Sequence, residues 1–168
     1  MATPNPFRIP VADLLKRHGA ARPETVSAPL AALCGQGAEV PADRAIDLDL
    51  TLERVSEGIV VRGSVQAHWQ AACSRCLAPV DGEVSVHVDE LFENHPLAGE
   101  TYLLDQDVID LEPLVRDALL LDLPAAPLCR EDCAGLCPEC GIDRNDASCD
   151  CGTEELDPRW AALRSLDL

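Results

Sequence analysis

Cysteine is the residue type in this chain whose spacing most clearly indicates chemistry. Six of the nine cysteines are concentrated near the C-terminus: Cys129, Cys133, Cys137, Cys140, Cys149 and Cys151. The Cys137-Pro-Glu-Cys140 pair places two sulfurs on one tight turn, the arrangement from which tetrahedral zinc sites are built. Gly141 follows the pair and can adopt a positive φ, which lets nearby amides point at the thiolates. The segment therefore predicts a Zn²⁺-binding module, structural in role because a closed shell of sulfur leaves no position for a substrate.

Six sulfur ligands exceed the four that one zinc ion needs, so two assignments stay open. The first uses Cys129, Cys133, Cys137 and Cys140. The second uses Cys137, Cys140, Cys149 and Cys151, like an ordinary two-knuckle zinc ribbon. Cys137 and Cys140 belong to both assignments. Reduced cysteines without metal are the plain alternative, and an iron–sulfur cluster is less favoured by the spacing.

A separate pair, Cys73-Ser-Arg-Cys76, lies between two predicted strands. We rank a tight structural connection first, a half-site for metal second and a redox dithiol third. A redox CxxC pair normally opens a helix in a βαβ context, which is absent here. The half-site interpretation fits the number of cysteines, because this pair and the six near the C-terminus make two sets of four ligands. Cys34 is isolated and is interpreted as a spare thiol.

The N-terminal residues contain no basic stretch followed by an apolar run of signal-peptide length, so we expect a cytoplasmic protein. The longest apolar runs, such as 118–121, are far too short to span a bilayer. In a reducing compartment, clustered cysteines are more often metal ligands than disulfides.

The net charge of −17 is unevenly distributed. Residues 1–44 carry five Arg/Lys against four Asp/Glu, whereas residues 45–128 carry four against sixteen and residues 129–158 carry two against nine. Proteins that bind nucleic acid directly normally present a basic face to the phosphates. Direct RNA binding is therefore disfavoured, a basic protein partner is electrostatically easier, and no membrane association is expected. No phosphate-binding glycine loop or nucleophile elbow supports an enzyme.

The hydrophobic pattern divides the chain into three parts. Residues 1–44 contain a predicted helix at 11–18, followed by an Ala-, Pro- and Gly-rich connector. Residues 45–126 show alternation typical of half-buried strands, with the last strand interrupted at 81–82, and then a helix from about position 110 that ends before Pro124.

Residues 127–168 hold the cysteine-rich zinc module and a last short helix beginning near Asp157-Pro158. The predicted fold class is α+β: an antiparallel β meander or partly closed barrel with flanking helices and a C-terminal zinc-binding module.

Several motifs in succession resemble those of the YceD family, whose members are described as large-subunit ribosomal RNA accumulation proteins. The motifs are Cys73-Ser-Arg-Cys76, Ile109-Asp110-Leu111-Glu112-Pro113-Leu114-Val115-Arg116-Asp117, Pro127-Leu128-Cys129, Asp132-Cys133, Gly135-Leu136-Cys137-Pro138, Cys140-Gly141 and Asp157-Pro158-Arg159-Trp160. The resemblance covers roughly residues 46–166. Some members place histidines near the positions of Cys149 and Cys151, which implies that these two cysteines also face the metal.

The resemblance implies a non-enzymatic role in 23S ribosomal RNA accumulation or processing, and hence in ribosome biogenesis and large-subunit assembly. Family members are typically encoded beside a small basic large-subunit ribosomal protein. A ribosomal protein or a large-subunit assembly intermediate is therefore the expected partner, held mainly through protein contacts by an acidic surface. The alternative is a zinc-dependent regulatory or thiol redox-sensing protein, in which Cys73 and Cys76 are the responsive thiols.

Overall fold

A computed structural model describes residues 5–96 and 98–151 of the chain. The elements found in these ranges are β1 (Arg8–Pro10), α1 (Ala12–Leu15), β2 (Ala21–Pro29), β3 (Leu33–Cys34), β4 (Glu39–Val40), β5 (Ala45–Arg54), β6 (Ile59–Ala72), β7 (Pro79–Glu93), β8 (Tyr102–Asp105), β9 (Val108–Asp110) and α2 (Glu112–Asp122). The described part is thus mostly strand, with two helices.

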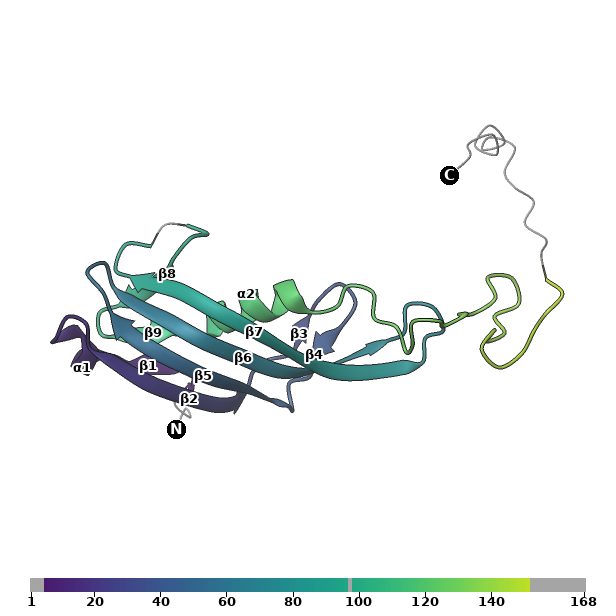
Figure 1. The fold of residues 1–168 in the computed structure, drawn as a ribbon, viewed down its shortest axis with the longest axis horizontal. Coiled ribbons are helices and arrows are strands. Elements are labelled where there is room, and N and C mark those ends of the chain that lie inside the picture. The colour runs from purple at the N-terminus through teal and green to yellow at the C-terminus, as the bar shows by residue number, and fades with distance from the viewer. Residues whose placement is uncertain (1–4, 97, 152–168) are drawn as a thin grey trace, which may run out of the picture.

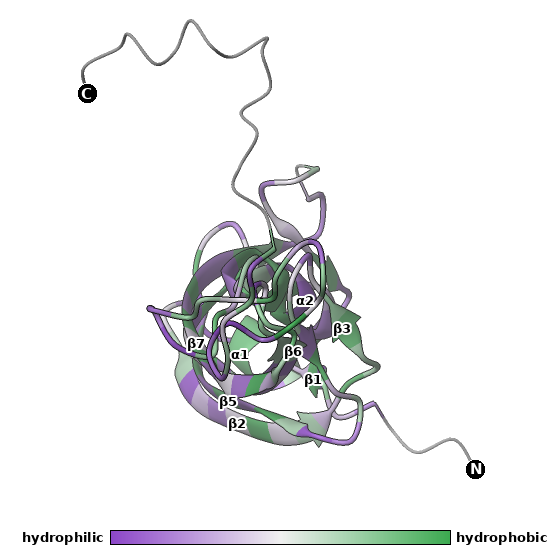
Figure 2. Ribbon diagram, turned by 90° about the vertical axis from the view of Figure 1, so that its right-hand side faces the viewer, coloured by the Kyte–Doolittle hydropathy of each residue, from purple (hydrophilic) through white to green (hydrophobic). Residues whose placement is uncertain are grey.

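The long strands form an antiparallel sheet in the order β2-β5-β6-β7. The short strands β8, β9 and β1 extend it beyond β7, and β8 joins β7 in parallel over only two residue pairs. The sheet is elongated and curls into a half-barrel, with α2 against its concave face (Figures 1 and 2). The predicted antiparallel meander is confirmed for β5, β6 and β7.

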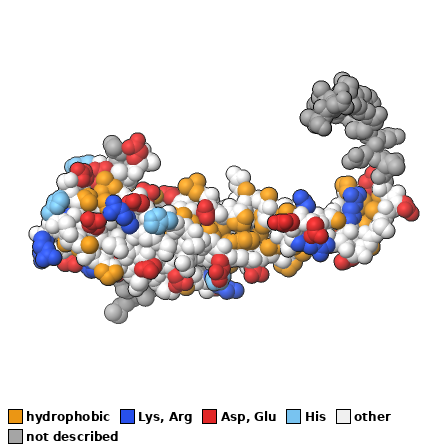
Figure 3. Space-filling model, in the orientation of Figure 1, with side chains coloured by type: hydrophobic (Ala, Val, Ile, Leu, Met, Phe, Trp, Pro, Cys, Tyr) orange, Lys and Arg blue, Asp and Glu red, His pale blue; other side chains and the backbone are white. Residues whose placement is uncertain are grey.

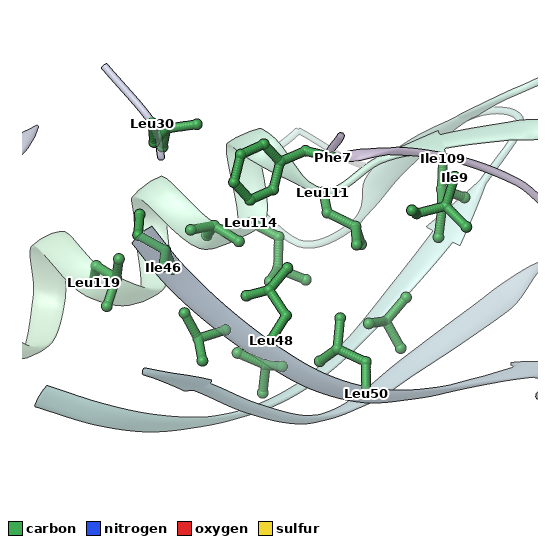
Figure 4. Packing of buried hydrophobic residues seen from close by; sticks show 14 of the residues in the cluster. Phe7, Ile9, Leu30, Ile46, Leu48, Leu50, Ile109, Leu111, Leu114 and Leu119 are labelled. Carbon is green, nitrogen blue, oxygen red and sulfur yellow. The ribbon is translucent and has the colours of Figure 1, made fainter. Parts of the chain in front are cut away.

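The core lies between the concave face of the sheet and α2 (Figure 4). Strand β5 shows the predicted alternation, because Ile46, Leu48 and Leu50 are buried and the residues between them are exposed. Leu114 and Leu119 of α2 lie opposite them and are buried as well. Burial of each large aliphatic side chain stabilises the fold by about 1.5–3 kcal/mol, so this interface fixes α2 on the sheet.

Helix α2 follows the prediction closely at both ends. Asp110 accepts a hydrogen bond from the N–H of Glu112 over 3.0 Å, at the start of the helix. Pro113 lies in the first turn, where a missing N–H costs nothing. The helix ends at Asp122, two residues before Pro124.

The expected connector after the first helix is instead a strand. Residues 21–29 form β2, which pairs with β5 in continuous register from Ala21 opposite Glu53 to Pro29 opposite Ala45. The prolines that indicated a loop are compatible with this strand because an edge strand leaves alternate N–H groups unpaired. The expected helix at 11–18 is also shorter, spanning Ala12–Leu15.

Strand β7 runs through the predicted interruption at Asp81-Gly82 without a break. Gly82 lies opposite Trp69 of β6, and a Cβ atom at Gly82 would come within 2.7 Å of the Trp69 ring. The glycine therefore leaves space for the Trp69 indole and does not mark a turn.

Two expectations concern the ends of the chain and the membrane. The predicted helix near Asp157-Pro158 lies outside the described residues. Among the residues that are described, none of the helices is long and apolar enough to cross a bilayer.

Candidate metal centres

The cysteine-rich segment extends the molecule beyond the end of the sheet at which β6 turns into β7 (Figure 1). Cys73 and Cys76 lie in that turn. The segment that follows α2 is attached to the turn by backbone hydrogen bonds, from the N–H of Ser74 to the carbonyl of Pro127 over 2.8 Å and from the N–H of Leu136 to the carbonyl of Arg75 over 2.9 Å. Cysteines far apart in the sequence are thereby brought to one place.

The structure gathers eight cysteines into two groups of four. The first group is Cys73, Cys76, Cys129 and Cys133, and the second is Cys137, Cys140, Cys149 and Cys151. Within each group all sulfur atoms lie within 4.8 Å of one another. The first group is the more buried, and three of its cysteines pack with Ala78, Val80, Leu128 and Leu136 in a small second core.

This grouping bears on the assignments left open by the sequence. Cys129, Cys133, Cys137 and Cys140 do not come together as one group, in contrast to the first assignment. The second assignment, in which Cys137 and Cys140 join Cys149 and Cys151, matches the observed grouping. The pair Cys73 and Cys76, ranked first as a structural connection, completes the other set of four. The physical reason is that the β6–β7 turn holds the backbone around Cys129 and Cys133.

Sulfur–sulfur distances in the first group fit a tetrahedral metal site. The Sγ atoms of Cys73 and Cys133 are 3.9 Å apart, and those of Cys76 and Cys129 are 3.6 Å apart. Four thiolates around zinc, each with a bond of about 2.3 Å, would have their sulfurs about 3.8 Å apart. A disulfide bond is only about 2.05 Å long, so these cysteines are not paired covalently. The donor set is therefore compatible with a metal ion that prefers sulfur.

The two CxxC pairs adopt the same turn. The N–H of Leu77 donates to the carbonyl of Cys73, and the N–H of Gly141 donates to the carbonyl of Cys137, each over 2.9 Å. Leu77 has φ 62° and Gly141 has φ 73°, both in the left-handed region. The positive φ expected at Gly141 is confirmed, and Leu77 occupies the equivalent position in the first group without the freedom of glycine.

Backbone amides in these turns favour the ionised form of the leading cysteine. Hydrogen bonds from the N–H groups of Cys76 and then Arg75 lower the pKa of Cys73 to about 6. The amides of Cys140 and Glu139 do the same for Cys137, whose pKa is also lowered to about 6. Thiolates are the form in which cysteine binds metal, so each turn presents a ligand that is ready at neutral pH.

The pKa shifts in the opposite direction at one other cysteine of each group. Its hydrogen bond to Cys133 raises the pKa of Cys129 to about 12, and that to Cys140 raises the pKa of Cys151 to about 12. Four sulfurs held this closely cannot all ionise without a compensating charge. A divalent cation would supply that charge, whereas protons do so in its absence.

Arg75 links the β6–β7 turn to the segment that carries Cys129 and Cys133. Its guanidinium donates to the carbonyls of Glu131 and Cys133 over 3.2 and 2.9 Å. Gly135, with φ 72°, lets the segment pass close by, because a Cβ atom there would lie 3.0 Å from the Arg75 carbonyl. Arg75 belongs to the CxRC motif, but the motif alone does not indicate this bridging role.

Two further side chains donate to the sulfurs, and sequence reasoning missed both. Asn145 donates from Nδ2 to the Sγ of Cys133 over 3.5 Å, and Arg144 donates from Nη2 to the Sγ of Cys137 over 3.8 Å. Asn145 also accepts from the N–H of Ala134 over 2.8 Å. It therefore connects the loop of the second group to the first group. No spacing rule predicts such a contact.

Cys34 belongs to neither group. It is exposed in β3, and its thiol lies 3.8 Å from Oε2 of Glu39. Its interpretation as a spare thiol is consistent with this position.

The fold and the cysteine groups together define a curled-sheet protein with a cysteine-rich module at the end of the sheet. The model of the family described as "Large ribosomal RNA subunit accumulation protein YceD" matches residues 61–167, which include all eight grouped cysteines. This chain belongs to the YceD family.

Two mycobacterial proteins are similar to much of this chain. An uncharacterized protein of Mycobacterium tuberculosis is 43% identical over 127 residues, which is 70% of this chain and 60% of that protein. An uncharacterized protein of Mycobacterium leprae is 37% identical over 72% of this chain and 58% of its own length. The matches thus span about three fifths of these relatives.

A third relative carries the family name. The "Large ribosomal RNA subunit accumulation protein YCED homolog 1, chloroplastic" of Arabidopsis thaliana is 36% identical over 58 residues, covering 34% of this chain and 18% of that protein. No solved structure matches the chain.

Proposed function

We propose that this chain is a non-enzymatic factor that supports accumulation or processing of 23S ribosomal RNA during large-subunit assembly. The observation that carries this proposal is membership of a family named for large ribosomal RNA subunit accumulation. The described residues give it physical support, because the side chains of the two cysteine groups have the chemistry of closed, structural metal sites rather than of a catalytic centre.

Contacts with protein rather than with RNA are the proposed mode of action. The net charge of −17 opposes the approach of a phosphate backbone. The same charge favours a basic ribosomal protein and increases its rate of association. A ribosomal protein, or an assembly intermediate that displays one, is therefore the proposed partner, in the cytoplasm.

Zinc is the proposed cofactor, one ion in each cysteine group. Eight sulfurs in two sets of four suit zinc, which takes tetrahedral thiolate ligands. In the first group the ion would join the β6–β7 turn to the segment after α2, and in the second it would hold the loop from Cys137 to Cys151. Both ions would stabilise a surface rather than activate a substrate.

The test is complementation of a bacterial strain that lacks its own family member. We expect the chain to restore the ratio of 23S to 16S ribosomal RNA and the large-subunit peak in a sucrose gradient. A variant with Cys76→Ser and Cys140→Ser should express poorly or restore less, and Cys34→Ser is the matched control outside both groups. Full RNA accumulation in the deletion strain without the chain would overturn the proposal.

Redox sensing through Cys73 and Cys76 is the second candidate. The lowered pKa of Cys73 would favour reaction with oxidants, but the grouping makes both thiols members of a four-sulfur set. Oxidant treatment of the metal-loaded protein, followed by thiol mapping, separates the two functions. A sensor would lose metal and form a bond between these two cysteines at oxidant levels that leave growth intact, whereas a structural site would resist.

A further inference from the structure

Strand β7 has an open backbone edge along most of its length. Its first edge pairs with β6 from Pro79 to Phe92. On the second edge, the described residues offer only β8, which pairs at Phe92 and Glu93. Exposed strand edges are templates for the addition of another strand, and proteins usually protect them.

A hollow with an apolar floor lies beside this edge, between β7 and α2. Two adjoining cavities of about 490 and about 200 Å³ share Glu90, Tyr102, Asp117 and Leu121 among their lining residues, so they form one continuous groove. Leu121 of α2 is 88% exposed. On the face shown in Figure 3, hydrophobic side chains gather along the middle of the body.

The large exposed leucines of α2 are unusual for a helix that packs on a sheet. Leu120 is 41% exposed and, with Leu121, lines the groove. Burying Leu114 and Leu119 already satisfies the core face of the helix. The extra leucines therefore leave apolar surface exposed on α2, next to the groove.

Besides the imidazole of His87, four carboxylates line the groove. They are Glu90, Glu100, Asp117 and Asp122. Asp117 is held in place by the phenol of Tyr102, which donates to it over 3.0 Å. Neither cavity has a lysine or arginine among its lining residues. An incoming segment would thus meet apolar surface and negative charge together.

We propose that this groove, defined by the open edge of β7 and the C-terminal half of α2, binds an extended basic segment of a partner protein as an added β-strand. The strand edge supplies backbone hydrogen bonds, Leu121 and Leu120 contact the apolar side chains, and the carboxylates contact Lys or Arg. This inference rests on the proposed function in one respect, since it locates the protein contact through which the chain acts.

The other long edge of the sheet does not offer the same features. Within the described ranges, β2 pairs on one side only, with β5, and Pro23 and Pro29 interrupt the donors of its other side. It therefore serves as an internal control for the proposal.

The test uses the full metal-loaded chain and a fluorescent synthetic peptide that alternates lysine with valine. A peptide that alternates glutamate with valine is the control probe. We expect the lysine peptide to bind, to bind less tightly as salt is raised, and to protect amides of β7 but not of β2 from hydrogen exchange. Protection of neither strand, or of both equally, would overturn the strand-addition geometry.

Two exposed groove residues allow substitutions that spare the fold. Leu121→Gln should weaken the lysine peptide about ten-fold, as loss of an apolar anchor does. Asp122→Asn should weaken it about two- to three-fold, whereas Asp49→Asn, the same change on the opposite face of the sheet, should have less effect. Unchanged binding by Leu121→Gln would overturn the groove as the binding site.

Complementation distinguishes failure of this inference from failure of the proposed function. If Leu121→Gln loses the peptide but restores 23S ribosomal RNA fully, the groove is not the working contact and the proposed function stands. If the unaltered chain binds the peptide in the groove but restores nothing, the binding site stands and the proposed function falls.

Discussion

The Sγ atoms of Cys76 and Cys129 lie 3.6 Å apart, although 53 positions separate the two residues in the chain. This contact joins the turn between β6 and β7 to the segment that follows α2. It brings the CxxC pair of this turn and two cysteines of the later segment into one set of four. The consequences of that relationship are testable.

Metal content should divide between the two cysteine groups. We expect two zinc ions per chain by elemental analysis of protein purified without chelator, one for each group. Cys76→Ser and Cys140→Ser should each remove one ion, because each takes a ligand from a different group, and the double variant should bind none. One ion in the unaltered chain, or loss of both with Cys140→Ser alone, would contradict the grouping.

Zinc affinity at the first group should fall as the pH falls. Cys73 and Cys133 have lowered pKa values, through backbone amides and through Asn145 respectively, whereas Cys76 and Cys129 have raised values. Near neutral pH the metal-free group therefore keeps the protons of Cys76 and Cys129, whereas Cys73 is largely ionised. Binding zinc must release at least these two protons, so affinity should rise by at least about 100-fold per pH unit.

This pH dependence can be measured in a Cys151→Ser background, which disables the second group, by competition with a chelator of known affinity. The slope should steepen below about pH 6, where Cys73 also becomes protonated. Affinity that does not change between about pH 7 and about pH 8 would show that the four thiols are not titrated as the structure indicates.

Asn145 should support zinc binding at the first group although it belongs to the loop of the second. Its amide donates to the Sγ of Cys133 and is the main cause of the lowered pKa of that cysteine. Asn145→Ala should weaken zinc about ten-fold at the first group, the usual cost of losing a partner of a metal ligand. Asn94→Ala, in an exposed loop, is the matched control. Equal effects of the two substitutions would remove the proposed link.

Leu77 should be a site at which glycine is preferred. Its φ of 62° costs a leucine about 1–2 kcal/mol, and its side chain is 65% exposed, so little packing would be lost. Glycine also raises the conformational entropy of the unfolded chain, which offsets part of the relieved strain. Leu77→Gly should therefore stabilise the protein by about 0.5 kcal/mol. Thermal denaturation measures this. The control is Leu103→Gly, in β8, which should destabilise by about 0.5–1 kcal/mol.

The hydrophobic pattern along the sequence predicted the strands and helices in which buried residues recur at a regular spacing. The alternation of Ile46, Leu48 and Leu50 defined β5, and the apolar face around Leu114 defined α2. Strand β2 was missed because its prolines look like loop residues until the strand is known to lie at an edge. That information resides in the sheet topology rather than in the segment itself.

The ligand grouping could not be predicted for the same reason. The spacing of Cys137 and Cys140 identifies a metal turn, but which cysteines join it depends on contacts across the fold. The hydrogen bonds of Arg75 to the backbone at Glu131 and Cys133 bring the first group together, and they leave no periodic signature. The second group, which is local in sequence, was among the open assignments, whereas for the half-site at Cys73 and Cys76 the sequence did not name the two completing cysteines.

Gly82 should resist substitution, although the sequence suggested a turn there. A Cβ atom at this position would lie 2.7 Å from Cζ2 and 2.9 Å from Cε2 of Trp69, so the indole or the strand would have to shift. Gly82→Ala should therefore destabilise the protein by about 1–3 kcal/mol, as other overpacking changes do. Urea denaturation followed by circular dichroism measures the loss.

The cause can be isolated with a double-mutant cycle. In a Trp69→Val background the indole is gone, and Gly82→Ala should then cost less than about 0.5 kcal/mol. A cost that is the same in both backgrounds would mean that the backbone of β7, rather than the Trp69 ring, requires glycine. Because the φ of Gly82 is not among the positive values of this chain, we expect the ring to account for most of the effect.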